Sequence, residues 1–96
     1  MSFQNLKQYG AADYTTSYTS DIQKVELRGN RTGVFQANLN TGDSLVLQGR
    51  LNNSFNWVTI LEASETDVLS EITLAPETQI VVTNTSGSAV IAGLHI

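Results

Sequence analysis

Few side chains of this 96-residue chain could take part in nucleophilic or acid–base chemistry. His95 is the single histidine, and the chain contains no cysteine. A nucleophilic triad needs a base, but His95 stands on an apolar stretch, where a structural or surface role is more common. One histidine without cysteine also supplies too few ligands for an ordinary zinc site. We therefore expect no catalytic residue, no metal and no cofactor, and a protein that is not an enzyme.

A short acidic segment holds Glu62, Glu65 and Asp67. Carboxylates at such spacing can bind Ca²⁺, but the ligand spacing and central glycine of the recognised calcium loop are absent. With Glu71 and Glu77 these residues could supply the acid and base groups of a glycosidase, although so small a domain offers little room for a cleft. A solvated acidic loop over residues 62–68 is the more ordinary interpretation.

Trp57 follows Phe55 at the start of a β-branched run. An exposed aromatic pair could stack on a sugar ring, with the amides of Asn52, Asn53 and Asn56 beside it. The simpler interpretation, which we favour, is that Trp57 fills the hydrophobic core.

The charge distribution argues against a nucleic-acid partner. The net charge is −4, and all five basic residues lie within the first fifty positions, while the rest of the chain carries only acidic charges. Proteins that bind nucleic acid need clustered basic side chains. No glycine-rich phosphate loop is present either, so we expect no nucleotide site.

A signal peptide begins with basic residues that are followed by an apolar stretch. Met1–Lys7 show no such pattern, so we expect no signal peptide. No segment approaches the roughly 20 apolar residues of a membrane helix. A chain without cysteine can fold in the cytosol. We therefore expect a soluble protein without a membrane partner.

Alternation of apolar and polar residues predicts strands through most of the chain. Turn signals rich in Asn, Gly and Ser separate them at spacings typical of a sandwich or barrel, and no helical period is visible. We therefore predict an all-β fold, a small antiparallel β-sandwich, jelly-roll-like or immunoglobulin-like, over residues 21–96. Its seven or so strands are expected at residues 21–28, 34–39, 45–51, 57–61, 68–74, 80–82 and 89–96.

Residues 1–20 differ in composition from the remainder, with two charges and several aromatic residues. We predict an extended N-terminal arm that packs on a partner, and a disordered terminus is the alternative. The side chains expected to make this contact are Phe3, Leu6, Tyr9, Tyr14 and Tyr18.

Several predicted strands are apolar on both faces, as at Val46, Val58 and Val81. The outer face of a two-layer sandwich is normally polar, so these faces need a cover, which could be a neighbouring subunit or the tyrosine-bearing N-terminal arm. We expect a homo-oligomer, with a trimer as the first choice.

The stretch Leu45–Ile60 has a strand that ends in Gly-Arg, a short polar turn, and then Trp-Val-Thr-Ile. Together with Pro76 and the turn Thr83–Gly87 before a last apolar strand, it resembles small structural proteins of bacteriophage particles over residues 34–96. The resemblance implies a capsid decoration (cement) protein, made in the host cytoplasm and bound to the major capsid protein on the virion surface. A tail or fibre component is less favoured. The main alternative is a carbohydrate-binding or host-adhesion module with Trp57 at its surface.

Overall fold

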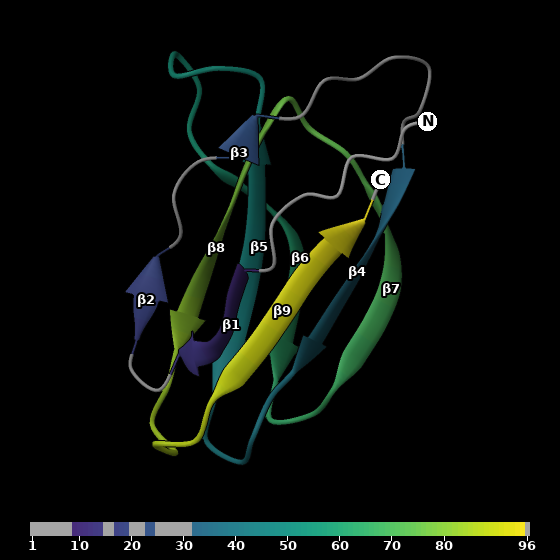
Figure 1. Ribbon diagram of the computed structural model, residues 1–96. Helices are drawn as coiled ribbons and strands as arrows, with labels where there is room; N and C mark the ends of the chain where they lie inside the picture. Colours follow the sequence, from purple (N-terminus) through teal and green to yellow (C-terminus); the bar gives the residue numbers. More distant parts are fainter. Residues whose placement is uncertain (1–8, 15–16, 20–22, 25–31, 96) are drawn as a thin grey trace.

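The computed structural model describes residues 9–14, 17–19, 23–24 and 32–95, and these residues form strands without any helix among them (Figure 1). Side chains are described for Ser17, Thr19, Lys24 and residues 32–95. The strands are β1 (Tyr9–Tyr14), β2 (Tyr18–Thr19), β3 (Gln23–Lys24), β4 (Thr32–Asn38), β5 (Ser44–Arg50), β6 (Val58–Ser64), β7 (Val68–Thr73), β8 (Glu77–Thr83) and β9 (Val90–His95).

Two antiparallel sheets make up the fold. The first sheet has the strand order β1-β9-β4-β7. The second has the order β2-β8-β5-β6, and β3 pairs with a further part of β8. Every described pairing is antiparallel. The predicted all-β, antiparallel class is therefore confirmed, and the arrangement is compatible with a small β-sandwich.

The chain changes sheet between most successive strands. From β4 onward, only the β5–β6 connection joins two neighbours in one sheet, and the other four connections cross from one sheet to the other. As a result, β9 lies between β4 and β1, and β8 lies between β5 and the short strands β2 and β3 (Figure 1). Strands from opposite halves of the chain thus stand side by side.

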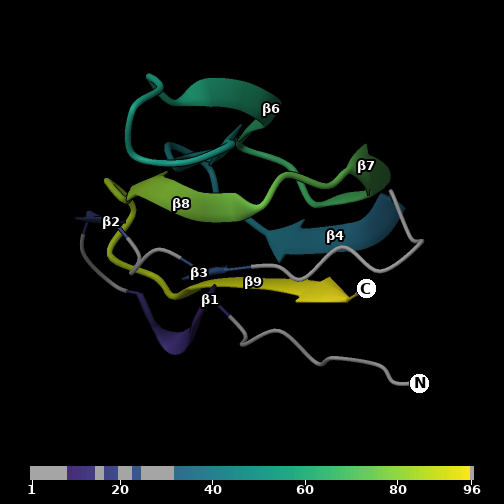
Figure 2. The same cartoon turned by 90° about the horizontal axis from the view of Figure 1, so that it is seen from above.

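The core lies between the two sheets. Viewed from above, β8 lies on one side and β4 and β9 on the other (Figure 2). Burial alternates along β4, where Phe35 and Ala37 face inward. The same alternation buries Leu45 and Leu47 of β5 and Ile80 of β8. Full burial of such side chains stabilises the fold by about 1.5–3 kcal/mol each.

The alternation of apolar and polar residues predicts the positions of the central strands well, but it predicts their first and last residues less accurately. Six of the predicted strands overlap β4 to β9, but β6 continues to Ser64 into the segment predicted as an acidic loop. That part of the prediction is wrong, because Glu62 and Ser64 face solvent while Ala63 faces the core. Of the predicted strand 21–28, Gln23 and Lys24 form β3, and Val25 and Leu27 lie outside the described residues.

A bulge in β6 explains part of the doubly apolar pattern. Leu47 pairs with Leu61 and Gln48 pairs with Thr59, so Ile60 is the extra residue. A bulge lets two successive side chains approach the same face, and both Ile60 and Leu61 pack against the core. These two residues therefore need no partner to cover them, whereas Val58 is exposed.

The described backbone of the predicted arm adds a strand to each sheet. β1 pairs with β9, and β2 pairs with β8. Phe3 and Leu6 lie outside the described residues, as do the side chains of Tyr9, Tyr14 and Tyr18. The domain boundary at residue 20 and the contact role of these five residues stay predictions.

Candidate functional site

The connection between β5 and β6 is the most exposed apolar segment that the structure describes. Residues 51–57, here called the β5–β6 loop, include Leu51 and Phe55, which are 60% and 51% exposed, and Val58, the first residue of β6, is 65% exposed. They account for three of the six large apolar side chains exposed in the described part of the chain. The side chains of Asn52, Asn53, Ser54 and Asn56 are exposed among them.

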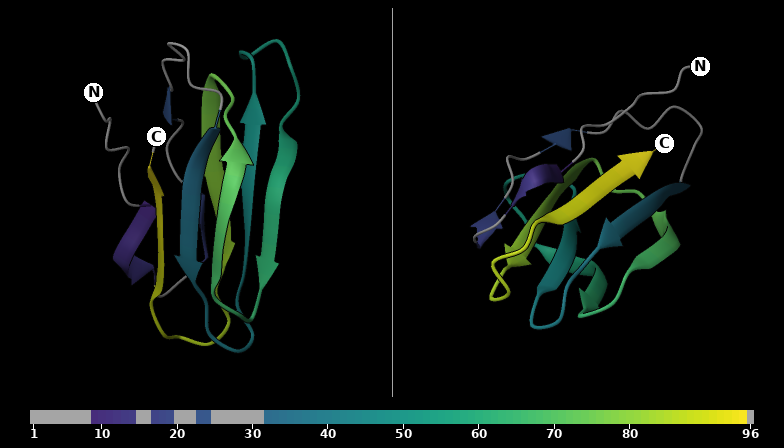
Figure 3. Two further views of the ribbon diagram at one scale, coloured as in Figure 1. Left: turned by 90° about the vertical axis from the view of Figure 1, so that its right-hand side faces the viewer. Right: turned by 60° about the horizontal axis from the view of Figure 1, so that its bottom comes forward.

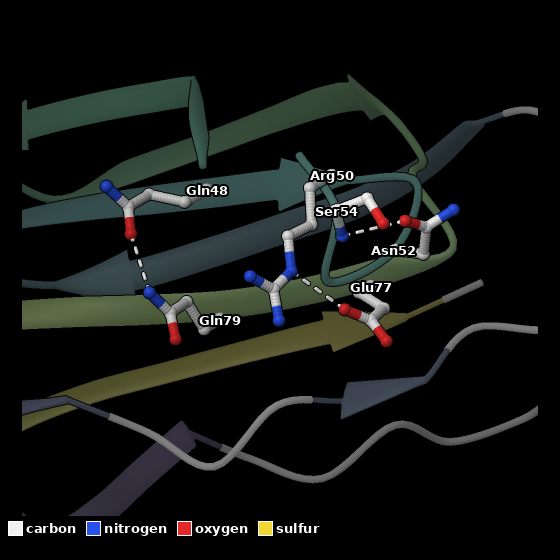
Figure 4. Close-up of polar contacts among 6 residues, drawn as sticks. All are labelled: Gln48, Arg50, Asn52, Ser54, Glu77 and Gln79. Carbon is white, nitrogen blue, oxygen red and sulfur yellow. Dashed lines mark hydrogen bonds and ion pairs between the residues drawn. The ribbon is translucent and has the colours of Figure 1, made fainter. Parts of the chain in front are cut away.

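Hydrogen bonds within the β5–β6 loop fix its conformation. The backbone carbonyl of Asn52 accepts from the Phe55 nitrogen at 3.1 Å, which closes a turn. The Oδ1 atom of Asn52 accepts from the Ser54 nitrogen at 2.8 Å (Figure 4). This side-chain turn is a common use of asparagine, which here holds the backbone in place. The loop therefore presents its exposed side chains from an ordered frame.

Trp57 lies at the base of the β5–β6 loop and outside the core. Its side chain is half-buried, and the Arg50 guanidinium carbon lies 4.0 Å from its ring centroid. The preferred prediction, that Trp57 fills the core, is wrong. Ile60 already occupies this end of the interior, since its Cδ1 atom lies 2.6 Å from the position that a Cβ on Gly49 would take.

Arg50 is held from two sides. Its Nε atom donates to Oε1 of Glu77 at 2.8 Å (Figure 4). Its planar group also stacks on the ring of Trp57. The side chains of Arg50 and Glu77 are 14% and 15% exposed. Stacking of a guanidinium on an aromatic ring contributes about 0.5–2 kcal/mol, more where water is excluded. The pair anchors the loop to β8.

A second polar pair lies beside the first on the outer face of the second sheet. Gln79 Nε2 donates to Gln48 Oε1 at 2.8 Å. Figure 4 shows the other polar atom of each amide pointing away from the pair. Val46 and Val81 face each other further along the same two strands and are half-buried. This face is thus polar near the β5–β6 loop and apolar further along.

Asp43, which directly precedes β5 at its opposite end, is a fully buried carboxylate. It accepts hydrogen bonds from the Thr85 and Ser86 nitrogens, both at 3.0 Å, and from the Ser86 hydroxyl at 2.8 Å. The backbone and side-chain nitrogens of Asn40 also donate to it, at 3.3 and 3.2 Å. Burial raises the pKa of Asp43, but hydrogen bonds from Ser86, Thr85 and Asn40 outweigh it and lower the pKa.

This network ties together two of the connections that cross between the sheets, the β4–β5 connection with Asn40 and Asp43 and the β8–β9 connection with Thr85 and Ser86. Figure 3 (left) shows these connections at one end of the molecule and the β5–β6 connection at the other. The Asn40–Asp43 segment is recognisable in the sequence as a turn, but no role for Asp43 follows from that. The missed signal is a short acidic side chain in one turn combined with Thr-Ser-Gly in another.

The acidic residues of the β6–β7 connection bind backbone groups of the β4–β5 connection. Glu65 Oε2 accepts from the Gly42 nitrogen at 3.0 Å, and Asp67 Oδ1 accepts from the Leu39 nitrogen at 3.1 Å. Glu62 instead faces outward on β6, opposite Val46. Within the described residues, no group of three or more His, Asp or Glu side chains is placed to hold a metal ion.

His95 is exposed on β9, where it pairs in register with Val34 of β4. It lies on the outer face of the first sheet, away from the inward-facing Phe35 and Leu94. None of the described segments forms a helix of the length and apolar character that crossing a membrane requires.

No protein-family model, no curated protein and no solved structure matches this chain. The assignment of a function therefore rests on strand topology and on the surfaces described above.

Proposed function

We propose that the chain is a structural protein of a bacteriophage particle, of the capsid decoration or cement type. In this proposal it binds the major capsid protein on the outer surface of the shell and stabilises it. It is made in the host cytoplasm, acts as a homo-oligomer and is not an enzyme. Such a protein reinforces a shell by adding buried area between capsid subunits.

The observation that carries the proposal is the strand order. The orders β1-β9-β4-β7 and β2-β8-β5-β6, with β2 and β3 sharing one position along β8, correspond to those of an eight-stranded jelly roll. Jelly rolls build viral capsid domains, lectin domains and cupins. We therefore propose the jelly roll as the finer fold. Because one fold hosts many functions, the surface must supply further support.

The outer face of the first sheet supports an assembled protein. Val34, Leu69 and Ile91 are exposed there, on three neighbouring strands. Leu69 pairs with Gln36, two residues along from Val34, so the two apolar side chains lie diagonally across from each other. We propose that copies of the chain bury this face in a trimer. The N-terminal segment, with Phe3, Leu6 and the three tyrosines, then makes the capsid contact.

The solution mass of the full chain tests the oligomer. Light scattering coupled to gel filtration should give a multiple of the 10.4 kDa chain mass, with three chains as the expected value. Substitution Leu69→Glu should shift that mass towards one chain, because it places a charge in the buried face. A single-chain mass for the unmodified protein would contradict the oligomer.

The protein composition of purified phage particles tests whether the chain is a component of the virion. Phage particles made from the genome that encodes this chain are purified, and their proteins are identified by mass spectrometry. The chain should be present in many copies, and antibodies against it should label heads in electron micrographs. Labelling of tails alone would favour the tail or fibre alternative, and absence from the particles would reject the proposal.

A further inference from the structure

We infer that the β5–β6 loop binds a neutral saccharide. The ring of Phe55 would stack on the apolar face of a sugar, and the amides of Asn53 and Asn56 would bond its hydroxyl groups. This site lies apart from the face of the first sheet that the capsid proposal assigns to the oligomer.

The composition of the loop complements a sugar ring. A pyranose has an apolar face of C–H groups and an edge of hydroxyls, each of which both donates and accepts hydrogen bonds. An exposed aromatic ring offers a flat apolar surface, and an amide offers a donor and an acceptor together. Phe55 is half-exposed, and Asn53 and Asn56 beside it in the chain are exposed as well.

The charges of the region favour a neutral ligand. Residues 51–61 carry no charged side chain. The guanidinium of Arg50, which directly precedes the loop, already pairs with Glu77 and stacks on Trp57. The ligand class that fits is therefore an uncharged oligosaccharide.

The loop is also organised before any ligand binds. Asn52 closes the turn through two hydrogen bonds, and Arg50 holds the Trp57 ring at its base. A preformed conformation reduces the entropy lost on binding. Binding residues commonly lie on loops that a rigid scaffold presents at its end, as the two sheets do here (Figure 3).

The fluorescence of Trp57 provides the assay, because Trp57 is the single tryptophan of the chain. The intact protein is titrated separately with maltohexaose, mannohexaose and chitohexaose as neutral probes, and with an alginate hexamer as the acidic probe. At least one neutral probe should change the emission saturably, with a dissociation constant of about 10 µM to 1 mM. No saturable change with any neutral probe would overturn the inference.

Matched variants locate the site. Phe55→Ala should weaken binding by about tenfold, and Asn56→Ala should weaken it less. Thr66→Ala removes an exposed side chain from the β6–β7 connection, away from the loop and from the face assigned to the oligomer, and should leave binding unchanged. Circular dichroism confirms that each variant is folded.

Equal affinity in the Phe55→Ala and unmodified proteins would reject the site, and tighter binding of the acidic probe would reject the neutral ligand. The titration needs no phage particle, so its failure would leave the capsid proposal standing. Absence of the chain from particles would likewise leave this inference intact.

Discussion

The carboxylate of Asp43 receives both polar hydrogens that Ser86 offers, one from the backbone nitrogen at 3.0 Å and one from the hydroxyl at 2.8 Å. The two residues are 43 positions apart in the chain and belong to different turns. A buried charge is tolerated only when hydrogen bonds replace its hydration. This relationship makes Asp43 the polar anchor of one end of the fold.

Replacement of Asp43 by alanine should destabilise the protein strongly. The change leaves the Thr85 and Ser86 nitrogens without their acceptor in a buried site, which costs more than the loss of an exposed hydrogen bond. We expect a fall of about 5–10 °C in the melting temperature followed by circular dichroism. The melting temperature of Asp43→Asn should lie between those of the unmodified protein and Asp43→Ala, because the single carbonyl oxygen of asparagine still accepts hydrogen bonds. An unchanged melting temperature in Asp43→Ala would show that the network contributes nothing.

The stability of the protein should depend on pH through Asp43. Its pKa in the folded state lies below the ordinary value of 3.8, so the folded state binds the proton less readily than the unfolded state. The stabilisation is therefore complete above that ordinary value and is lost as the pH falls towards the folded-state pKa. Urea unfolding between neutral pH and about pH 2 should show this loss. In Asp43→Asn this part of the pH dependence should be missing, and an identical profile in both proteins would contradict the assignment.

Phe35 should be the most costly single side chain to remove from the core. It is fully buried on the central strand β4, between β7 and β9. Truncation of a buried phenylalanine to alanine typically costs about 3–5 kcal/mol in the free energy of unfolding. Val58→Ala, at a 65% exposed position of β6 outside the proposed oligomer face, provides the comparison, with an expected change within about 0.5 kcal/mol. Chemical denaturation measures both, and similar values for the two would contradict the inward assignment of Phe35.

Arg50 should control the environment of Trp57. Arg50→Lys keeps the positive charge but loses the planar group that stacks on the ring. We expect a red-shifted Trp57 emission and stronger quenching by acrylamide, with a stability loss of about 0.5–2 kcal/mol. Gln48→Ala is the control, since it changes the neighbouring polar pair alone. Emission unaltered in Arg50→Lys would show that the stack does not shield the ring.

The sequence pattern predicts which segments form strands more readily than it predicts which side chains are exposed. Alternation is enough to find a strand such as β5, where every second residue is buried. It cannot find the bulge at Ile60, because a single inserted residue leaves the same apolar run in the sequence. A large aromatic side chain at the start of an apolar run likewise favours a core position for Trp57, although Ile60 fills that space.

The sequence pattern does not predict contacts between turns that lie far apart in the chain. Asp43 and Ser86 each have the composition of an ordinary turn, and their pairing appears only when two crossing connections are placed at one end. The loop at the other end was predicted as a turn and as one possible sugar platform. Gly49 is the last inward-facing residue of β5, and the loop residues 51–56 that follow are exposed.

The position of β9 between β4 and β1 bears on how the chain acquires its fold during synthesis. Translation adds about 5–20 residues per second, so β1 leaves the ribosome seconds before its partner strand exists. Until then its backbone groups can pair only with water or with the wrong strand. Folds dominated by such remote pairings form slowly. For this protein the first sheet cannot be completed before β9 has been synthesised, because β9 is the strand that joins β1 to β4.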